Sequence, residues 1–260
     1  MPCGSLDVVG CGIRAVTQLT LEARRCIEAA DLVCYAVSDR VSARWLERRH
    51  PAAVSLSAHY REGSDRLETY RRMIDALVEP VRAGRRVCAV FYGHPGVFVH
   101  PSHEAIRRLR AEGLPARMLP GISAADCLFA DLGVDPGSGF QTFSATDFVR
   151  RPRCLDPSAH VIFWQIDSIG DNSYRSTGND ARNLPLLLTA LAGHYPPAQP
   201  ACLYEAAVLP VGRPVMRWLA LRELWGGAAV LDGMSTLYIP PIRAPQPDPA
   251  MRQRLGLPAV

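Results

Sequence analysis

The stretch Val90–His103, VFYGHPGVFVHPSH, decides which fold the chain is expected to adopt. A run of apolar residues ends at Tyr92, and a Gly-His-Pro-Gly turn at residues 93–96 follows before the chain resumes as Val-Phe-Val. Glycines and a proline-fixed turn let backbone groups and neighbouring rings come close to a bound molecule. The stretch therefore predicts a buried strand that ends in a ligand-binding turn.

Strands and helices alternate on both sides of this turn. The sequence predicts a helix from near Thr20, with Glu22 in its first turn, and another over residues 102–113. Such alternation implies a largely parallel sheet, whose ligands lie outside the carboxyl ends of the strands. Three turns fall at those ends: Gly-Cys-Gly at 10–12, the turn at 93–96, and Pro-Gly-Ile-Ser at 120–123. The first of them lacks the third glycine of a dinucleotide-binding fingerprint, so a dinucleotide is not expected there.

The segment Asp65–Gly84, DRLETYRRMIDALVEPVRAG, has the apolar spacing of a helix. Asp65 and Glu68 form a pair like a capping box, which makes Arg66 the first helical residue. Arg66 and Tyr70 are four positions apart, so the guanidinium and the phenol project from one face and can converge on one point. This helix is therefore a candidate to carry two functional side chains.

The pattern of strands and helices becomes less regular from Asp135, where VDPGSG is expected to be a linker. The segments HVIFWQI, ACLYEAA and MSTLYIPP are predicted strands, separated by stretches rich in proline, asparagine and glycine. We predict an N-terminal α/β domain over residues 1–136, a more irregular α/β domain over 137–242, and an extended, proline-rich tail over 243–260.

The composition excludes several kinds of chemistry. All 29 basic residues are arginines, so neither a lysine Schiff base nor a Gly-Lys-Ser phosphate loop can form. The net charge of +4 does not indicate nucleic-acid binding, because 25 acidic residues are interleaved with the arginines. No signal-peptide pattern and no apolar run of about 18 residues occurs, so we expect a cytoplasmic protein without membrane contact.

The cysteines show neither a Cys-x-x-Cys pair nor a neighbouring histidine at metal-ligand spacing. We therefore predict reduced, buried thiols and no metal site. The residues concerned are Cys3, Cys11, Cys26, Cys34, Cys88, Cys127, Cys154 and Cys202.

Four segments in order, VGCG....QLT, YGHPGVF, LPGISA and MSTLYIPP, resemble those of the tetrapyrrole methylase superfamily, the class III S-adenosylmethionine methyltransferases. Within it the chain most resembles the borosin α-N-methyltransferases, which methylate backbone amides of peptides. Its most specific matches are YREGSDRLETY, VFYGHPGVFVHPSH and ARMLPGISAADCLFADLGVDP. Tetrapyrrole methylases usually carry Gly-Asp-Pro where this chain has Gly-His-Pro, and they lack the Arg-x-x-x-Tyr pattern of residues 66–70. The resemblance implies a two-domain α/β fold with S-adenosyl-L-methionine in the cleft between the domains.

The same resemblance implies which residues contact the cofactor. His103 is expected instead to be an ordinary loop or capping histidine, a role that His94 could also have. The implied cofactor contacts are Tyr92, His94, Val97, Phe98, Ser123 and Ala124 in the first domain and Gln165, Tyr204, Ser235 and Thr236 in the second.

The resemblance assigns Tyr60, Arg66, Tyr70 and Tyr92 to catalysis. When a backbone amide loses its proton, negative charge gathers on the carbonyl oxygen, and donors placed there lower the barrier. Arg66 and Tyr70 suit this role, and the positive end of the helix dipole favours an anion near them. Tyr60 could accept the proton if Arg66 lowers its pKa, although which tyrosine is the base stays open. The alternative is that Tyr70 is a core residue and Arg66 a solvated charge.

Fungal borosin enzymes continue beyond the methyltransferase domain into the peptide they modify, whereas this chain stops soon after IPP. It therefore resembles the split, bacterial type, and the expected activity is methylation, in trans, of a separate precursor peptide. We expect a homodimer, or a heterotetramer with two precursors. Three alternatives stay open. The chain could methylate a small molecule such as a porphyrin or a precorrin. It could be a catalytically silent binding partner, or an arginine-rich protein that binds nucleic acid.

Overall fold

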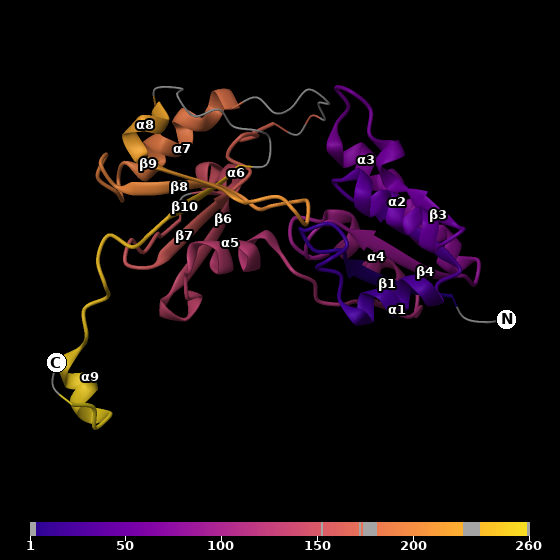
Figure 1. Ribbon diagram of the computed structural model, residues 1–260, viewed down its shortest axis with the longest axis horizontal. Helices are drawn as coiled ribbons and strands as arrows, with labels where there is room; N and C mark the ends of the chain where they lie inside the picture. Colours follow the sequence, from indigo (N-terminus) through magenta and orange to yellow (C-terminus); the bar gives the residue numbers. More distant parts are fainter. Residues whose placement is uncertain (1–3, 152, 172, 174–180, 226–234, 259–260) are drawn as a thin grey trace. The chain divides into compact units, whose positions relative to one another are not determined.

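The computed structural model describes residues 4–151, 153–171, 173, 181–225 and 235–258. Within these residues the chain forms two compact units (Figure 1). The first unit ends at Val134 and also contains Ser173 and the segment Ala206–Val215, and the second begins at Asp135. The sequence pattern suggested a boundary at residue 136 but gave no sign that later segments return to the first unit.

The first unit is a parallel sheet with helices on both faces. Its strands lie in the order β3-β2-β4-β1-β5, and every neighbouring pair is parallel, which confirms the sheet predicted from the alternation. The elements are β1 (Ser5–Gly10), α1 (Leu21–Ala29), β2 (Leu32–Ala36), α2 (Arg40–Arg49), β3 (Ala53–Ser55), a 3₁₀ helix (Leu56–His59), α3 (Arg66–Arg82), β4 (Arg86–Phe91), α4 (His100–Ala111), β5 (Ala116–Met118) and α5 (Ala124–Leu132).

Both faces of this sheet are buried. Leu6 and Val8 of β1 belong to a core that also contains residues of α3 and α4, whereas Val9 belongs to a second core with residues of α1 and α2. Successive side chains of a strand point to opposite faces, so each strand contributes to both cores. The sheet thereby holds the ends of its strands at fixed positions.

Local signals set the starts of the helices. Thr20 caps α1, and Asp65 caps α3 with its side chain, so Arg66 is the first helical residue, as predicted. α4 begins at His100, two positions before the predicted start, with Pro101 in its first turn. Proline suits this position because its missing N–H would have no helical partner there. β3 is short, ends at Ser55 and leads directly into the 3₁₀ helix Leu56–His59.

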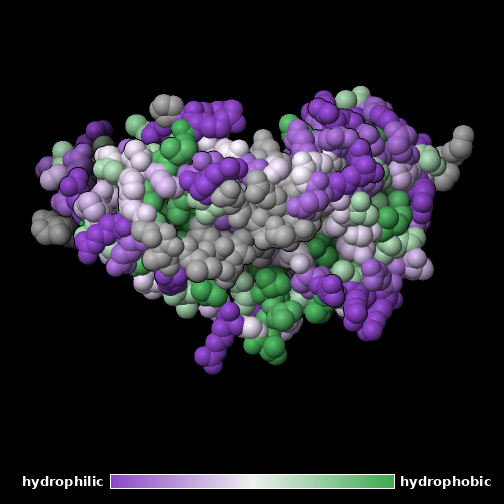
Figure 2. All heavy atoms as spheres, turned by 90° about the horizontal axis from the view of Figure 1, so that it is seen from above, coloured by the Kyte–Doolittle hydropathy of each residue, from purple (hydrophilic) through white to green (hydrophobic). Residues whose placement is uncertain are grey.

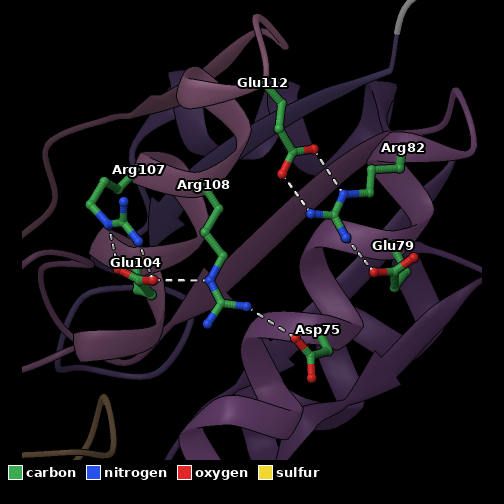
Figure 3. Close-up of polar contacts among 7 residues, drawn as sticks. All are labelled: Asp75, Glu79, Arg82, Glu104, Arg107, Arg108 and Glu112. Carbon is green, nitrogen blue, oxygen red and sulfur yellow. Dashed lines mark hydrogen bonds and ion pairs between the residues drawn. The ribbon is translucent and has the colours of Figure 1, made fainter.

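Ion pairs join α3 to α4 (Figure 3). Arg82 of α3 contacts Glu112, the residue after α4, at 2.5 Å, and Arg108 of α4 contacts Asp75 of α3 at 3.2 Å. These pairs hold the helix that carries the candidate functional side chains against its neighbour.

We expect Glu104→Gln to lower the free energy of unfolding by about 1 kcal/mol at neutral pH. Arg107 and Arg108 hold the pKa of Glu104 at about 2, below the ordinary value of 4.5. Because the pKa of Glu104 is lower in the folded protein, its stabilising effect is complete at a pH above the pKa of the unfolded chain. The effect is lost as the pH falls through the pKa of the folded protein. Urea unfolding should therefore show a difference between the two proteins that shrinks between about pH 4.5 and about pH 2.

Glu79→Gln is the matched control, because the Glu79 side chain is 64% exposed and its ion pair with Arg82 is screened by water. It should change the stability by less than Glu104→Gln. Equal effects of the two substitutions, or a difference for Glu104→Gln that does not depend on pH, would contradict the assignment.

The second unit contains a mixed sheet in the order β6-β7-β10-β8-β9. β10 is antiparallel to both β7 and β8, and β6 is parallel to β7. The elements are a 3₁₀ helix (Pro136–Ser138), β6 (Phe140–Ser144), α6 (Ala145–Arg150), β7 (His160–Trp164), a 3₁₀ helix (Ala181–Asn183), α7 (Leu184–Leu191), β8 (Pro200–Glu205), β9 (Val215–Ala220), α8 (Leu221–Trp225), β10 (Thr236–Ile239) and α9 (Pro249–Arg254).

Two predictions for other parts of the chain need correction. The tail is not extended throughout, because Asp248 caps the short helix α9. Cys154 is exposed rather than buried, and Cys26 and Cys127 are half-buried. All described cysteines are free thiols, those at 11, 34, 88 and 202 are buried, and Cys3 lies outside the described residues.

Hydrophilic side chains dominate the face shown in Figure 2, with hydrophobic side chains in smaller groups between them. In the described part of the chain, the helices are too short or too polar to cross a membrane.

Candidate functional site

The three turns predicted to bind a ligand meet at the carboxyl ends of β4, β1 and β5. The Gly93 N–H donates to the Gly12 carbonyl at 2.9 Å, and the Gly12 N–H donates to the Gly93 carbonyl at 3.4 Å. The Cys11 N–H donates to the carbonyl of Phe91, the last residue of β4, at 2.9 Å. The first two turns therefore form one continuous backbone unit.

These turns are so close together that side chains do not fit between them. A Cβ atom on Gly10 would lie 2.1 Å from the Gly93 carbonyl oxygen and 2.9 Å from Cδ of Pro95. A Cβ atom on Gly121, in the third turn, would lie 3.2 Å from the same oxygen. Glycine is required here because the backbones of three loops make direct contact.

The end of the Gly-His-Pro-Gly turn presents apolar side chains to solvent. Val97 is 43% exposed and Phe98 is 50% exposed. Phe98 has a φ of 57°, which a residue with a bulky side chain rarely adopts. Such strain is found mostly where a binding site needs a particular backbone shape. The predicted contact residues Val97 and Phe98 thus stand on a strained, solvent-facing segment.

Two histidines hold the shape of this turn. The Gly96 N–H donates to Nδ1 of His94 at 3.0 Å, so the proton of the neutral His94 ring is on Nε2. Nε2 of His103 lies 2.8 Å from the Gly96 carbonyl oxygen. His103 is a residue of α4, not a loop or capping histidine as expected, and its ring supports the turn. His94 offers Nε2–H as a donor.

The predicted catalytic residues of the first unit lie on and beside α3. Arg66 is its first residue and Tyr70 follows one turn later, and both side chains are partly buried. Tyr60 and Tyr70 both pack against the core that contains α3 and α4. The Tyr70 ring is 6.1 Å, centroid to centroid, from the ring of His100 at the start of α4. His100 had no predicted role, because only the packing of α3 on α4 brings it near Tyr70.

Tyr92 lies at the junction of β4 and the turn. Its N–H donates to the carbonyl of Ala36, at the end of β2, at 3.0 Å. Burial raises the pKa of the Tyr92 phenol well above its ordinary value, and the Asp39 carboxylate adds to the shift. Tyr92 is therefore a neutral phenol at physiological pH, suited to donating a hydrogen bond and not to accepting a proton as phenolate.

The third turn leads directly into α5. Ser123 caps this helix, and its hydroxyl donates to Asp126 at 2.7 Å in a capping box. Because the Ser123 hydroxyl is engaged in the cap, a ligand near Ser123 and Ala124 meets mainly backbone.

The predicted residues of the second unit gather at one edge of its sheet. Tyr204 of β8 and Thr236 of β10 are direct partners across the two strands. Gln165, with a φ of 58°, follows β7, and Ser235 precedes β10. Because β7 and β10 are antiparallel, with Phe163 paired to Leu237, the residue after β7 and the residue before β10 lie at the same end of the sheet.

Ser235 also identifies a polar residue that the sequence analysis missed. Its hydroxyl donates to Oε1 of Glu205, the last residue of β8, at 2.6 Å. Tyr204 as a whole residue is only 1% exposed. Within the described residues, no cluster of histidine, cysteine or acidic side chains has the composition of a metal site.

A parallel sheet with three glycine-containing turns at its strand ends, followed by a mixed α/β unit, is the architecture of class III S-adenosylmethionine methyltransferases. The chain belongs to the tetrapyrrole (corrin/porphyrin) methylase family, whose model matches residues 5–214. S-adenosyl-L-methionine is the methyl donor of this family, and the predicted cofactor is confirmed at that level. The tight glycine turns and the exposed Val97 and Phe98 fit a cofactor that contacts backbone and apolar groups closely.

Curated relatives carry a more specific description. The chain is 40% identical, over 98% of its own length, to the "methyltransferase/ribosomally synthesized cyclic peptide gymnopeptides precursor" of Gymnopus fusipes. It is 41% identical, over 92% of its length, to the corresponding omphalotin A precursor of Omphalotus olearius. The chain covers 61% and 58% of these two proteins, so it spans about three fifths of the relatives it matches.

Solved structures agree on the fold. The uroporphyrin-III C-methyltransferase of Thermus thermophilus superimposes with a TM-score of 0.64 over 99% of this chain and 98% of that one, at 22% identity. The same enzyme complexed with S-adenosyl homocysteine gives a TM-score of 0.62 over 91% of this chain and 92% of that one, at 21% identity. The predicted two-domain methyltransferase fold is therefore confirmed.

Proposed function

We propose that the chain is an S-adenosylmethionine-dependent α-N-methyltransferase that methylates backbone amides of a precursor peptide. The observation that carries the proposal is the pair Arg66 and Tyr70, which stand one turn apart at the start of α3. Relatives about 40% identical to the chain are named as methyltransferases joined to cyclic-peptide precursors, which supports a peptide substrate. The Thermus enzyme complexed with S-adenosyl homocysteine supports a site for the product of the cofactor on this fold.

In this proposal Arg66 and Tyr70 donate hydrogen bonds to the substrate carbonyl oxygen as it gains negative charge. Donors that are in place before the reaction stabilise such an oxyanion most. Tyr92, held as a neutral phenol by burial, completes the donor set. Tyr60 remains the candidate base, because it is partly buried near the start of α3. The bound cofactor supplies the methyl group to the amide nitrogen.

We propose that the cofactor is contacted in the first unit by Tyr92, His94, Val97 and Phe98 and by the backbone at Ser123 and Ala124. The residues proposed for the second unit are Gln165, Tyr204, Ser235 and Thr236. His94 donates from Nε2, because its Nδ1 already accepts the Gly96 N–H. Calorimetry with S-adenosyl-L-methionine should show binding to the purified chain. If neither the cofactor nor its demethylated product gave any heat of binding, that result would contradict the site.

A second candidate is methylation of a porphyrin, a precorrin or another small molecule. The family match over residues 5–214 and the fold of the uroporphyrin-III methyltransferase favour it. An absorbance scan of the purified chain separates the two candidates in part, because a bound tetrapyrrole would absorb strongly in the visible range. The Arg-x-x-x-Tyr pattern of α3 favours the peptide.

We propose further that the precursor is a separate polypeptide, as in the split type, and that the enzyme is a homodimer, or a heterotetramer with two precursors. The chain, its candidate precursor from a neighbouring reading frame and the cofactor should be incubated together and analysed by fragment mass spectrometry. Each methyl group should add its mass to a backbone nitrogen of the precursor and none to this chain. Methylation of this chain itself would contradict the action in trans, and side-chain methylation would contradict the backbone specificity.

A further inference from the structure

A groove on the first unit lies outside the proposed site. Its lining combines apolar side chains with arginines of α2: Val16, Val41, Arg44, Trp45, Arg48 and Arg49. We call it the α2 groove.

The charge of the α2 groove is not balanced within the described part of the chain. Arg40, Arg44 and Arg48 follow one another at four-residue steps on one face of α2, all are exposed, and none has an acidic partner among the residues described. Arg49, by contrast, contacts Glu28. Like charges at this spacing repel one another, so an anion bound along the stripe would relieve the repulsion.

The floor of the α2 groove is apolar. Val41 is 47% exposed, and Trp45 packs with part of its ring against the core beneath α2. Val16 has a φ of 63°, which a β-branched residue adopts only under strain. The strained backbone of Val16 places an apolar side chain at the edge of the arginine stripe. An exposed surface has no need of such strain, which is found mostly at functional sites.

The α2 groove is connected to the Gly-His-Pro-Gly turn through the backbone. Val16 belongs to the segment that follows Gly12, whose N–H and carbonyl bond with Gly93. At the other end, Asp39 caps α2, and Ala36, three residues earlier, accepts the Tyr92 N–H. The segments at both ends of the α2 groove are therefore tied by backbone hydrogen bonds to the turn region that contains Tyr92, while α2 itself packs on the sheet face opposite α3.

We infer that the α2 groove docks an acidic, amphipathic segment of the precursor polypeptide, away from the amides that are methylated. This inference rests on the proposed peptide substrate. Carboxylates of the segment pair with Arg40, Arg44 and Arg48, and its apolar side chains contact Val41 and Trp45. A nucleic acid matches the charge but not this floor, since Trp45 packs against the core instead of offering a free ring for stacking. Docking there raises the effective concentration of the methylated segment near the site.

The test measures binding of the full chain to a labelled short peptide of repeated Glu-Glu-Leu by fluorescence anisotropy, without cofactor. Arg44→Gln combined with Arg48→Gln should weaken binding about tenfold, and added salt should weaken binding to the unaltered chain. The matched control combines Arg222→Gln with Arg254→Gln, two exposed arginines of the second unit. It removes the same charge and should leave the affinity unchanged.

Three results would overturn the inference: no binding to the unaltered chain, equal losses in the two double variants, or equal affinity for a Gln-Gln-Leu peptide. Tighter, competing binding of a single-stranded oligonucleotide would also overturn it, in favour of nucleic acid. Because the assay involves no methyl transfer, arginine-dependent binding without any peptide methylation would uphold the docking groove and refute the proposed reaction. Peptide methylation without arginine-dependent binding would refute only the docking groove.

Discussion

We expect Arg66→Lys and Tyr70→Phe each to lower the turnover of a precursor peptide by about a hundred- to a thousand-fold, which is the usual cost of losing one oxyanion donor. Cofactor affinity should stay nearly unchanged. Arg66 is the first residue of α3 and Tyr70 stands one turn later, so both serve the carbonyl oxygen of the substrate in the proposed mechanism. Lysine keeps the charge of Arg66 but cannot reproduce its planar fork of donors.

Two measurements separate this mechanism from a structural role for the same residues. Rates with saturating peptide report the chemical step, and calorimetry with S-adenosyl-L-methionine reports the cofactor site. Arg71→Lys is the matched control for Arg66, because Arg71 is an exposed arginine of the same helix. Tyr195→Phe is the control for Tyr70, because the buried Tyr195 hydroxyl has no partner among the described residues. A cofactor affinity that fell in step with the rate would show that the roles are wrongly assigned.

The sequence predicted the first unit well because its signals are local. Alternation of strands and helices implied a parallel sheet, and all neighbouring strands of the first unit are parallel. The capping pattern at Asp65 placed the start of α3, and with it the relation between Arg66 and Tyr70. Both features depend on residues a few positions apart, which is why a single sequence contains them.

Features that depend on distant contacts were missed. The edge strand β9 has mostly exposed side chains, so it lacks the buried pattern that marks a strand. His100 lies within the quoted stretch Val90–His103 and Glu205 within ACLYEAA, but each becomes a candidate only when packing brings it to Tyr70 or Ser235. The arginine stripe of α2 was also missed, because acidic residues are interleaved with the arginines along the sequence, and its apolar floor includes Val16, which only the fold brings to α2.

The second large effect should come from Gly10→Ala, which adds a single methyl group. Its Cβ atom would lie 2.1 Å from the Gly93 carbonyl oxygen, a backbone atom that cannot move alone because the Gly93 N–H is bonded to Gly12. The clash must push the Gly-His-Pro-Gly turn away from β1. We expect the free energy of unfolding to fall by about 3 kcal/mol and the folded protein to bind S-adenosyl-L-methionine at least tenfold more weakly.

Urea unfolding gives the stability, and calorimetry at a temperature where the variant is still folded gives the affinity. Gly193→Ala is the matched control, because the added Cβ atom would meet only one ordinary contact, at 3.9 Å. That substitution should leave both quantities almost unchanged. If Gly10→Ala lost stability but bound the cofactor normally, the turn would matter for folding alone and the cofactor would have to lie elsewhere. If the cofactor binds to a turn built from contacting backbones, a single added methyl group should lower both the stability and the cofactor affinity.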